Sequence, residues 1–331
     1  MSKLVDSFNR EITYLRVSVT DHCNYHCTYC RTKEESGSKR CEILSYEQIA
    51  RIIRIFTELG VEKVRLTGGE PLVRKDITKL IKMIDKLPGL KDLALSTNAH
   101  LLKRFAKTLK TNGVKRLNIS LDTLDKEKFK HITQGGNLAK VLTGIDEAIK
   151  NKISPIKINM VVMRDFNDNE IETMLNYAIG KNIQLRFIET MPIGEAGLSA
   201  TAKYYPKEKI MQRVKDYFTD KELVEQEINK YDGPATIYNV SNTKTSVGII
   251  SAVSKHFCKT CNRVRLTAKG ELVLCLGQED SYSIRDDILL GKTDKQIKYN
   301  ILKAILKKPE KHEFNTNEQK IKIRKMVAIG G

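Results

Sequence analysis

Short β-type runs alternate with amphipathic helical segments through the first two-thirds of the 331-residue chain. Six such runs are predicted, and they span residues 14–20, 61–67, 91–97, 114–122, 155–163 and 183–191. Helical patterns separate them, and the first helix begins with the capping-box pair Ser45 and Gln48 and ends at Gly60. Repeated β/α units predict a parallel sheet with right-handed crossovers. Because eight units would close a barrel, six predict an incomplete (β/α)6 TIM-like barrel, with a doubly wound open sheet as the alternative.

The pattern changes after about residue 225, where short strand-like runs and a lysine-rich helical stretch replace the β/α units. We therefore expect two domains: residues 1–225 form the partial barrel, and residues 226–331 form a smaller C-terminal α+β domain. In either sheet arrangement, ligands should bind at the carboxyl ends of the strands. The least ordinary residues of the sequence follow the strands at those ends.

Three of the seven cysteines lie in one loop after the first predicted strand. Cys23, Cys27 and Cys30 have the spacing C-x3-C-x2-C. A structural zinc site normally has four ligands in two separated pairs, whereas three thiolates on one loop suit three corners of an iron–sulfur cubane. The fourth iron would then be open to a substrate or a cofactor. Zinc is the alternative, with His22 or His26 as its fourth ligand.

A second triplet near the C-terminus, Cys258, Cys261 and Cys275, has the spacing C-x2-C-x13-C and no evident fourth ligand. Two such triplets predict two [4Fe-4S] clusters, each with an open iron, and a zinc ribbon is the alternative for the second. Arg263 and Arg265 lie inside this motif, and their spacing places them on one face of a strand. Two guanidiniums beside a cluster suit a polyphosphate or carboxylate substrate, although a surface salt-bridge pair has the same spacing.

The composition limits partners and location. A formal net charge of +18 attracts polyanions, which include nucleic acids, anionic membranes and nucleoside triphosphates. No apolar run approaches the roughly 18 residues of a membrane span, and the N-terminus lacks an apolar signal core. Because clustered thiols are typical of a reducing compartment, we expect a cytoplasmic protein. Cys41 stands alone and is interpreted as an incidental thiol, and the segment 32–44 has no assigned role.

An aromatic residue, Tyr29, precedes the last cysteine of the first triplet, and the second strand ends in "LTGGEPL" at 66–72. Together these motifs resemble the signature of the radical S-adenosylmethionine (SAM) enzymes. The resemblance implies that the open iron binds the amino and carboxylate groups of SAM. Gly68 and Gly69 would let the backbone approach closely, and Glu70 would accept a hydrogen bond from the ammonium group. The cofactor then yields a 5'-deoxyadenosyl radical that abstracts hydrogen from the substrate.

With "FCKTCNRVRL" at 257–266 and the terminal "GG", the whole chain resembles the GTP 3',8-cyclases, which catalyse the first step of molybdenum cofactor biosynthesis. This family uses SAM to convert GTP into (8S)-3',8-cyclo-7,8-dihydroguanosine 5'-triphosphate. The SAM contacts that the resemblance implies are Tyr29, Gly68, Gly69, Glu70, Ser120 and Met191. The implied GTP contacts are Arg16, Lys63, Arg65, Ser96, Lys157, Arg263 and Arg265.

The resemblance also implies partners. They are an electron donor such as a ferredoxin or flavodoxin and, downstream, the cyclic pyranopterin monophosphate synthase. A homodimer is compatible with the sequence, whereas binding to a membrane or to nucleic acid is not expected. We further predict that Gly330 and Gly331 reach into the site and orient GTP for hydrogen abstraction at C3', with a loose chain end as the alternative.

Two other functions fit part of the sequence. A peptide-modifying radical SAM enzyme with an auxiliary cluster would explain the cysteines but does not need the Arg263–Arg265 pair. A zinc-stapled nucleic-acid-binding protein would explain the cysteines and the basic charge, but neither the "GGEP" motif nor the β/α units.

Overall fold

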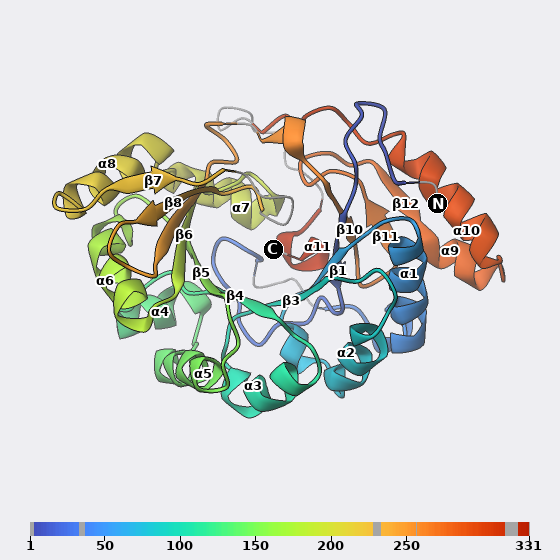
Figure 1. Cartoon of the computed structure of the whole chain (residues 1–331). Coiled ribbons are helices and arrows are strands. Elements are labelled where there is room, and N and C mark those ends of the chain that lie inside the picture. The colour runs from blue at the N-terminus through green and yellow to red at the C-terminus, as the bar shows by residue number, and fades with distance from the viewer. Residues whose placement is uncertain (1–2, 33–36, 228–232, 256, 315–323, 331) are drawn as a thin grey trace.

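The six strands predicted from the sequence form the middle of one curved sheet in the computed structural model, which describes residues 3–32, 37–227, 233–255, 257–314 and 324–330 (Figure 1). Each strand pairs in parallel with the next one along the chain. The strands are β1 (Tyr14–Ser18), β2 (Lys63–Thr67), β3 (Asp92–Thr97), β4 (Arg116–Ser120), β5 (Ile156–Val161) and β6 (Gln184–Ile188). The predicted α/β fold with an open, partial barrel of parallel strands is thereby confirmed.

Strands from the last part of the chain extend this sheet at both edges. Beyond β6, β9 (Ser246–Ile250) pairs in parallel, followed by the antiparallel strands β8 (Thr236–Val240) and β7 (Leu223–Glu225). Beyond β1, β10 (Arg263–Leu266) also pairs in parallel, and β11 (Glu271–Val273) and β12 (Ser281–Ser283) follow in antiparallel order. The described sheet therefore has twelve strands with β12 and β7 at its edges. The boundary near residue 225 stays a prediction, because the C-terminal strands continue the barrel wall.

Helices cover the outside of the curved sheet (Figure 1). The first begins at the predicted capping box, in which the Ser45 hydroxyl accepts from the Gln48 amide and the Gln48 side chain accepts from the Ser45 amide. The outer helices are α1 (Tyr46–Glu58), α2 (Ile77–Asp85), α3 (Leu102–Thr111), α4 (Lys126–Thr133), α5 (Leu138–Lys150) and α6 (Ile171–Lys181). The later helices are α7 (Gly194–Ala200), α8 (Lys207–Tyr217), α9 (Ile284–Leu289), α10 (Asp294–Ile305) and α11 (Met326–Ile329).

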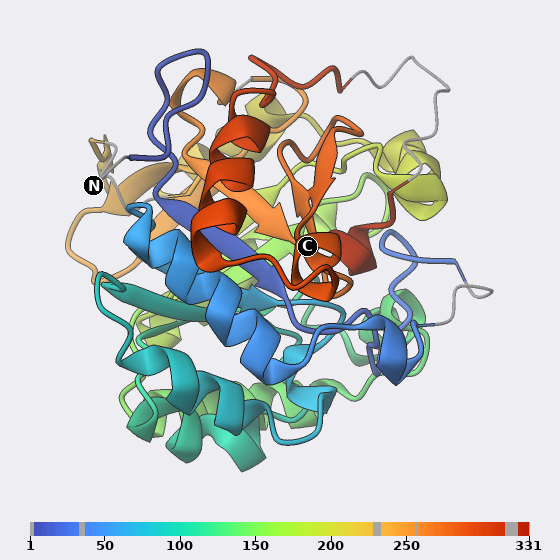
Figure 2. The same cartoon turned by 90° about the vertical axis from the view of Figure 1, so that its right-hand side faces the viewer.

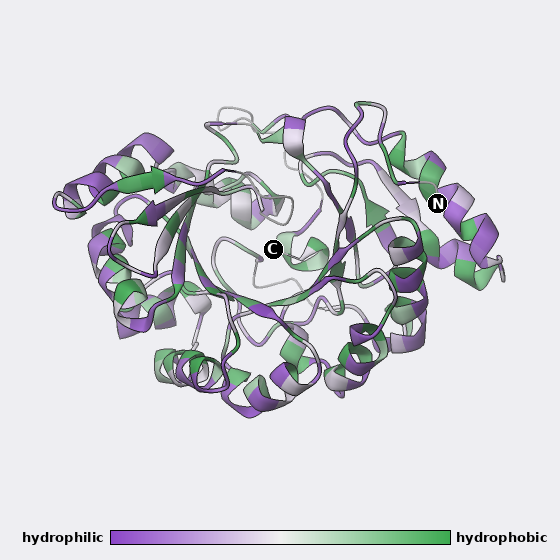
Figure 3. Cartoon of the chain, viewed as in Figure 1, coloured by the Kyte–Doolittle hydropathy of each residue, from purple (hydrophilic) through white to green (hydrophobic). Residues whose placement is uncertain are grey.

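The parallel strands alternate apolar and polar side chains. In β1 and β2, for example, Leu15, Val17, Val64 and Leu66 belong to the main hydrophobic core, whereas the residues between them are mostly polar. Because successive residues of a strand point to opposite faces, one face packs against the helices and the other faces the interior of the barrel. Figure 3 shows hydrophilic and hydrophobic residues along the strands. The interior thus receives polar side chains from these strands, and a second, smaller apolar cluster contributes Val273 and Phe314 to the cavity lining.

The C-terminal helix α11 lies inside the ring of strands in Figure 1. Its residues Val327 and Ile329 are buried. Among the helices that the structure describes, none is both long and apolar enough to cross a bilayer.

Candidate active site

A single cavity inside the curved sheet brings the two cysteine triplets together. All six cysteines of these triplets line it, together with residues from the carboxyl ends of the parallel strands. The first triplet lies on the loop after β1. In the second, Cys258 begins a short 3-10 helix (Cys258–Thr260), Cys261 precedes β10, and Cys275 follows β11. The β10–β1 pairing thus brings segments more than 200 residues apart in sequence to one wall.

The glycine motif after β2 is bonded to the loop that carries the first triplet. The Gly69 amide donates to the Thr20 carbonyl at 2.7 Å, and the Glu70 amide donates to the His22 carbonyl at 2.8 Å. A Cβ atom on Gly68 would lie 2.3 Å from the Thr20 oxygen, and one on Gly69 would lie 2.2 Å from the His22 oxygen. Only glycine permits this approach of the two loops, so the motif fixes the position of the cysteine loop.

Glu70 lies beneath the cavity wall rather than on it. Its carboxylate accepts hydrogen bonds from the Leu72 amide at 3.1 Å, the Thr97 hydroxyl at 2.8 Å and the Asn98 amide at 2.7 Å. Burial raises the pKa of this carboxyl to about 7, against the lowering effect of those donors. Glu70 therefore ties the ends of β2 and β3 together, and its contact with a SAM ammonium group stays a prediction.

The other predicted SAM contacts lie on the cavity wall. Tyr29, Gly68, Gly69, Ser120 and Met191 all line the cavity.

Asp122, which sequence reasoning did not select as a site residue, anchors Tyr29. The Tyr29 hydroxyl donates to Asp122 Oδ2 at 2.8 Å, while Oδ1 accepts from the Val161 amide at 2.8 Å. This bridge fixes the aromatic residue of the cysteine motif to the ends of β4 and β5.

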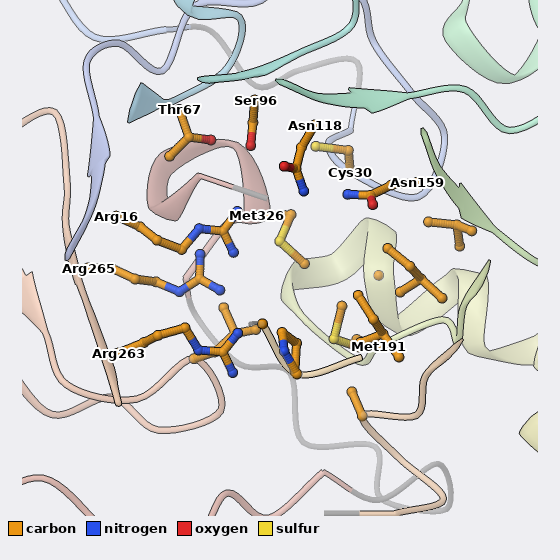
Figure 4. A pocket seen from close by; sticks show the side chains of 18 of the residues that line it. Arg16, Cys30, Thr67, Ser96, Asn118, Asn159, Met191, Arg263, Arg265 and Met326 are labelled. Atoms are coloured by element: carbon orange, nitrogen blue, oxygen red, sulfur yellow. The ribbon is translucent and has the colours of Figure 1, made fainter. Parts of the chain in front are cut away.

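Arginines form the wall between the two triplets. Strand register places Arg16 of β1 level with Arg265 of β10 and Arg65 of β2, and Arg263 lies two residues before Arg265. Figure 4 shows Arg16, Arg263 and Arg265 extending into the cavity from the same side. Burial, followed by the charge of Arg263, lowers the pKa of Arg265 to about 10, and burial together with Arg265 lowers that of Arg16. An anion in the cavity would relieve this crowding of like charges.

Two of the predicted GTP contacts lie outside the cavity lining. Lys63 is buried, its ammonium nitrogen being 4.5 Å from the centre of the Tyr14 ring and 3.7 Å from Asp92 Oδ2. Burial, followed by the charge of Arg65, lowers the pKa of Lys63 to about 6. Lys157 is also buried and does not line the cavity, whereas Ser96 does. Phosphate contacts for the two lysines stay predictions.

Two basic residues that no sequence motif singled out, Arg10 and Lys308, hold the second triplet in place. Arg10 Nη1 donates to the Cys258 carbonyl at 2.8 Å, and Lys308 Nζ donates to the carbonyl of Leu274, next to Cys275, at 2.5 Å. Burial raises the pKa of the Cys261 thiol, but Arg263 and Lys308 outweigh it and bring the pKa to about 7. Cys261 thus lies in a basic environment that favours its thiolate, whereas burial raises the pKa of Cys258.

Gly330 lies against the arginine wall. Its carbonyl accepts from Arg265 Nη1 at 2.5 Å, and the Ile329 carbonyl accepts from the same nitrogen at 3.2 Å. The residue has a φ of +71°, and a Cβ atom on it would lie 2.3 Å from Thr67 Cγ2. The last residue, Gly331, lies outside the described residues, so the tail as an orienting device stays a prediction.

The two histidines that zinc could use at the first triplet have other partners. In the part of the chain that the structure describes, no three His, Cys, Asp or Glu side chains converge as ligands of one ion would. His22 and His26, the candidate fourth ligands, contact the Ser38 carbonyl and Arg31 instead. Cysteines that each bind a different iron of a cubane need not converge on one point.

Comparisons with known proteins agree with this geometry. Residues 17–178 match the family model "Radical SAM superfamily", and residues 183–314 match "Molybdenum Cofactor Synthesis C". The GTP 3',8-cyclase of Hydrogenovibrio crunogenus is 52% identical over 330 residues, covering 99% of both chains. That of Alkaliphilus oremlandii is 42% identical over 327 residues, covering 98% of this chain and 99% of the relative.

Among solved structures, SuiB of Streptococcus suis bound to S-adenosylmethionine superimposes with a TM-score of 0.65 at 15% identity. The match covers 86% of this chain and 66% of that one. SuiB bound to its precursor peptide SuiA gives a TM-score of 0.66, also at 15% identity, and covers 92% of this chain and 67% of that one. At this identity the likeness shows the fold alone.

The contact between the two loops predicts that Gly69→Ala displaces the cysteine loop. Overpacking of this kind lowers the free energy of unfolding by about 1–3 kcal/mol. We expect a lower melting temperature and less iron bound after anaerobic reconstitution. Gly180→Ala is the matched control, since a Cβ atom at Gly180 in α6 meets nothing within 4 Å and alanine favours helix. Equal melting and iron content of the Gly69→Ala variant and the wild type would contradict this role.

The arginine wall predicts a polyphosphate site that can be tested without turnover. Arg263→Met should raise the melting temperature of the ligand-free protein, because it removes a charge that crowds Arg16 and Arg265. The same change should reduce the melting shift caused by inorganic tripolyphosphate, which would stabilise the wild type by about 2.7 kcal/mol at 100 times its Kd. Arg164→Met, an exposed arginine far from the wall in sequence, is the control. An unchanged tripolyphosphate shift in Arg263→Met would reject the site.

Proposed function

Because the chain belongs to the GTP 3',8-cyclases, within the radical SAM superfamily, we propose that it converts GTP into (8S)-3',8-cyclo-7,8-dihydroguanosine 5'-triphosphate. One observation carries the proposal: a single cavity is lined by both cysteine triplets, with buried arginines on the wall between them. The site can hold a cluster and SAM at one end and a triphosphate beside a second cluster at the other. This reaction begins molybdenum cofactor biosynthesis.

At the first end, Cys23, Cys27 and Cys30 would hold a [4Fe-4S] cluster, which with SAM supplies the hydrogen-abstracting 5'-deoxyadenosyl radical. The protein's part is orientation. The bonds of Gly69 and Glu70 hold the cysteine loop, and Asp122 holds Tyr29 against the cofactor.

At the second end, Cys258, Cys261 and Cys275 would hold another [4Fe-4S] cluster whose open iron faces the substrate. Arg16, Arg65, Arg263 and Arg265 would bind the triphosphate, because guanidiniums form paired, charge-assisted hydrogen bonds with phosphate. GTP bound through both its guanine base and its triphosphate would present its ribose to the end of the cavity that carries the first cysteine triplet. Hydrogen abstraction at C3' depends on that placement.

The proposal includes partners and location. The reaction needs a one-electron donor, for which a ferredoxin or flavodoxin is proposed, and its product passes to the cyclic pyranopterin monophosphate synthase. Thiolate-bound clusters suit a reducing compartment, so we place the enzyme in the cytoplasm.

Serine variants of the two triplets separate their roles. Protein reconstituted anaerobically with iron and sulfide is supplied with SAM, GTP and dithionite, and 5'-deoxyadenosine and cyclised nucleotide are measured by mass spectrometry. We expect Cys23→Ser to abolish both products, because a hydroxyl is a poor ligand for the iron. We expect Cys258→Ser to lose about half of the iron of a two-cluster protein and the cyclised product, while 5'-deoxyadenosine still forms. Cys41→Ser is the control and should retain both products. Wild type that cleaves SAM but never cyclises GTP would reject the function.

Removal of Gly330 and Gly331 tests whether the C-terminal tail orients GTP. The shortened protein should keep its iron, bind GTP and cleave SAM, yet form far less cyclised product, because abstraction requires accurate placement of C3'. Gly330→Ala provides a point variant, since a Cβ atom there meets Thr67 at a positive φ. Normal cyclised product from the truncated protein would show that the tail is a loose end.

A further inference from the structure

Exposed apolar side chains gather around α10 and the N-terminal segment. Eight large apolar side chains are exposed in the described part of the chain, and six of them lie here: Val5, Phe8, Leu289, Leu290, Tyr299 and Leu306. Tyr299 and Leu306 are both 56% exposed, and Phe8 is 45% exposed. Such a concentration is a mark of an interaction site, whereas single exposed apolar residues are ordinary.

Tyr299 lies on α10 and Leu306 at its C-terminal end, whereas Leu289 and Leu290 precede its first turn. Tyr299, Lys303 and Leu306 are spaced by four and three positions, which places them on one face of the helix. The Ser7 hydroxyl donates to the Leu306 carbonyl at 2.6 Å and thus brings the neighbouring Phe8 to the end of that face. Figure 2 shows α10 on the outer surface, beside α1. We name the strip of Phe8, Tyr299, Lys303, Leu306 and Lys307 the α10 surface.

The charge of the α10 surface and its surroundings is positive. Lys295, Lys303, Lys307 and Lys311 are exposed, and the Lys303 ammonium lies 4.6 Å from the centre of the Tyr299 ring. Among the nearby carboxylates, Asp294 pairs with Arg51 and Arg54, and Asp287 with Lys292. Asp286, Glu310 and Glu313 are exposed, and the four exposed lysines outnumber them. A partner that covers the apolar strip would therefore have to be acidic.

The α10 surface lies next to the second cysteine triplet. The Arg10 guanidinium is 5.2 Å from the centre of the Phe8 ring, and its Nη1 donates to the Cys258 carbonyl at 2.8 Å. The same guanidinium donates to the Pro309 and Glu310 carbonyls, just beyond α10, at 2.6 Å each. One side chain thus joins the surface strip, the end of α10 and the backbone of a proposed cluster ligand.

Two other occupants fit less well. A second copy of the chain in a two-fold symmetric contact would place Lys303 and Lys307 against the same lysines. A nucleic acid would supply phosphates for the lysines but nothing apolar to cover Leu306, although Phe8 and Tyr299 could stack on bases.

The electron count of the proposed reaction calls for a protein partner. Cleavage of SAM consumes one electron. Hydrogen abstraction and closure of the C3'–C8 bond then leave one unpaired electron on the nucleotide, and one further electron and one proton give the closed-shell product. Each turnover therefore takes two electrons from a reductant. SAM cleavage requires one of them at the first cluster, whereas the second cluster adjoins the nucleotide and the α10 surface.

We propose that the α10 surface is the docking site of an acidic one-electron donor protein, of the flavodoxin or ferredoxin class, which reduces the second cluster by one electron while being oxidised by one. No bond forms or breaks in this transfer. The inference rests on the proposed function, because it requires the second cluster. The proposal gives the lysine-rich C-terminal stretch a role in binding a partner protein.

The test measures binding of a purified bacterial flavodoxin to the cluster-loaded protein by calorimetry at two salt concentrations. We expect the variant Lys303→Glu with Lys307→Glu to bind at least tenfold more weakly than wild type, and with less salt dependence. The matched control is Lys103→Glu with Lys107→Glu on α3, two exposed lysines with the same spacing on another helix, which should bind like wild type. Leu306→Ser should also weaken binding, which separates a docking surface from general charge attraction. Carbodiimide cross-linking followed by mass spectrometry should join flavodoxin carboxylates to Lys303 or Lys307.

The outcomes distinguish this proposal from the proposed function. Dithionite needs no docking site, so the charge-reversed variant should cyclise GTP normally with dithionite and slowly with reduced flavodoxin. Failure of wild type with dithionite would reject the function and leave the binding result to stand alone. The docking site is overturned if the charge-reversed variant binds flavodoxin as wild type does, or if wild type binds neither flavodoxin nor ferredoxin. It is equally overturned if sedimentation shows that the substitutions dissociate a dimer of this chain.

Discussion

The parallel register that aligns Arg265, Arg16 and Arg65 on three neighbouring strands is the constraint on which the interior depends. Guanidiniums cannot be buried together inside an apolar barrel, because each loses hydration and repels the others. The inner wall accordingly carries polar side chains such as Thr67, Ser96 and Asn118 beside the arginines, with Val161 and Ile188 at the ends of β5 and β6. Buried like charges of this kind are unfavourable for folding alone, so their presence on one wall is best understood as a site prepared for an anion.

A second constraint acts at the opposite end of the cavity. The cysteine loop is long and has little regular structure of its own, yet a cluster would need its thiolates in fixed positions. The loop takes its position from neighbours: the amides of Gly69 and Glu70 bind its carbonyls, and Asn98 Nδ2 contacts Asn24 Oδ1 at 2.9 Å. Glu70 in turn binds the Asn98 amide. The "GGEP" motif thus supports the cysteine loop through backbone hydrogen bonds.

The sequence predicted what is local and periodic. The six inner strands, the Ser45–Gln48 cap and the position of the first cysteine triplet after β1 follow from patterns within about 20 residues. It did not predict that β9 and β10 would pair with β6 and β1, because strand pairing over such separations leaves no local trace. For the same reason Arg10 and Lys308 were missed.

The alternation of polar and apolar residues in strands such as "YLRVS" and "KVRLT" could have indicated a polar inner face of the sheet, since fully buried parallel strands are usually apolar on both faces. Resemblance alone placed Lys63 and Lys157 with the substrate, and their burial outside the cavity lining leaves that role to be tested.

Arg265 connects the arginine wall with the C-terminal end of the chain. A guanidinium has five N–H donors, and in this structure Nη1 is used by the Ile329 and Gly330 carbonyls. This contact ties the described end of the chain to the arginine wall that we propose for the triphosphate. Gly330 is also confined by β2, since a Cβ atom on it would lie 2.3 Å from Thr67 Cγ2. A positive φ and this close approach leave no room for a side chain, which explains physically why glycine occupies that place.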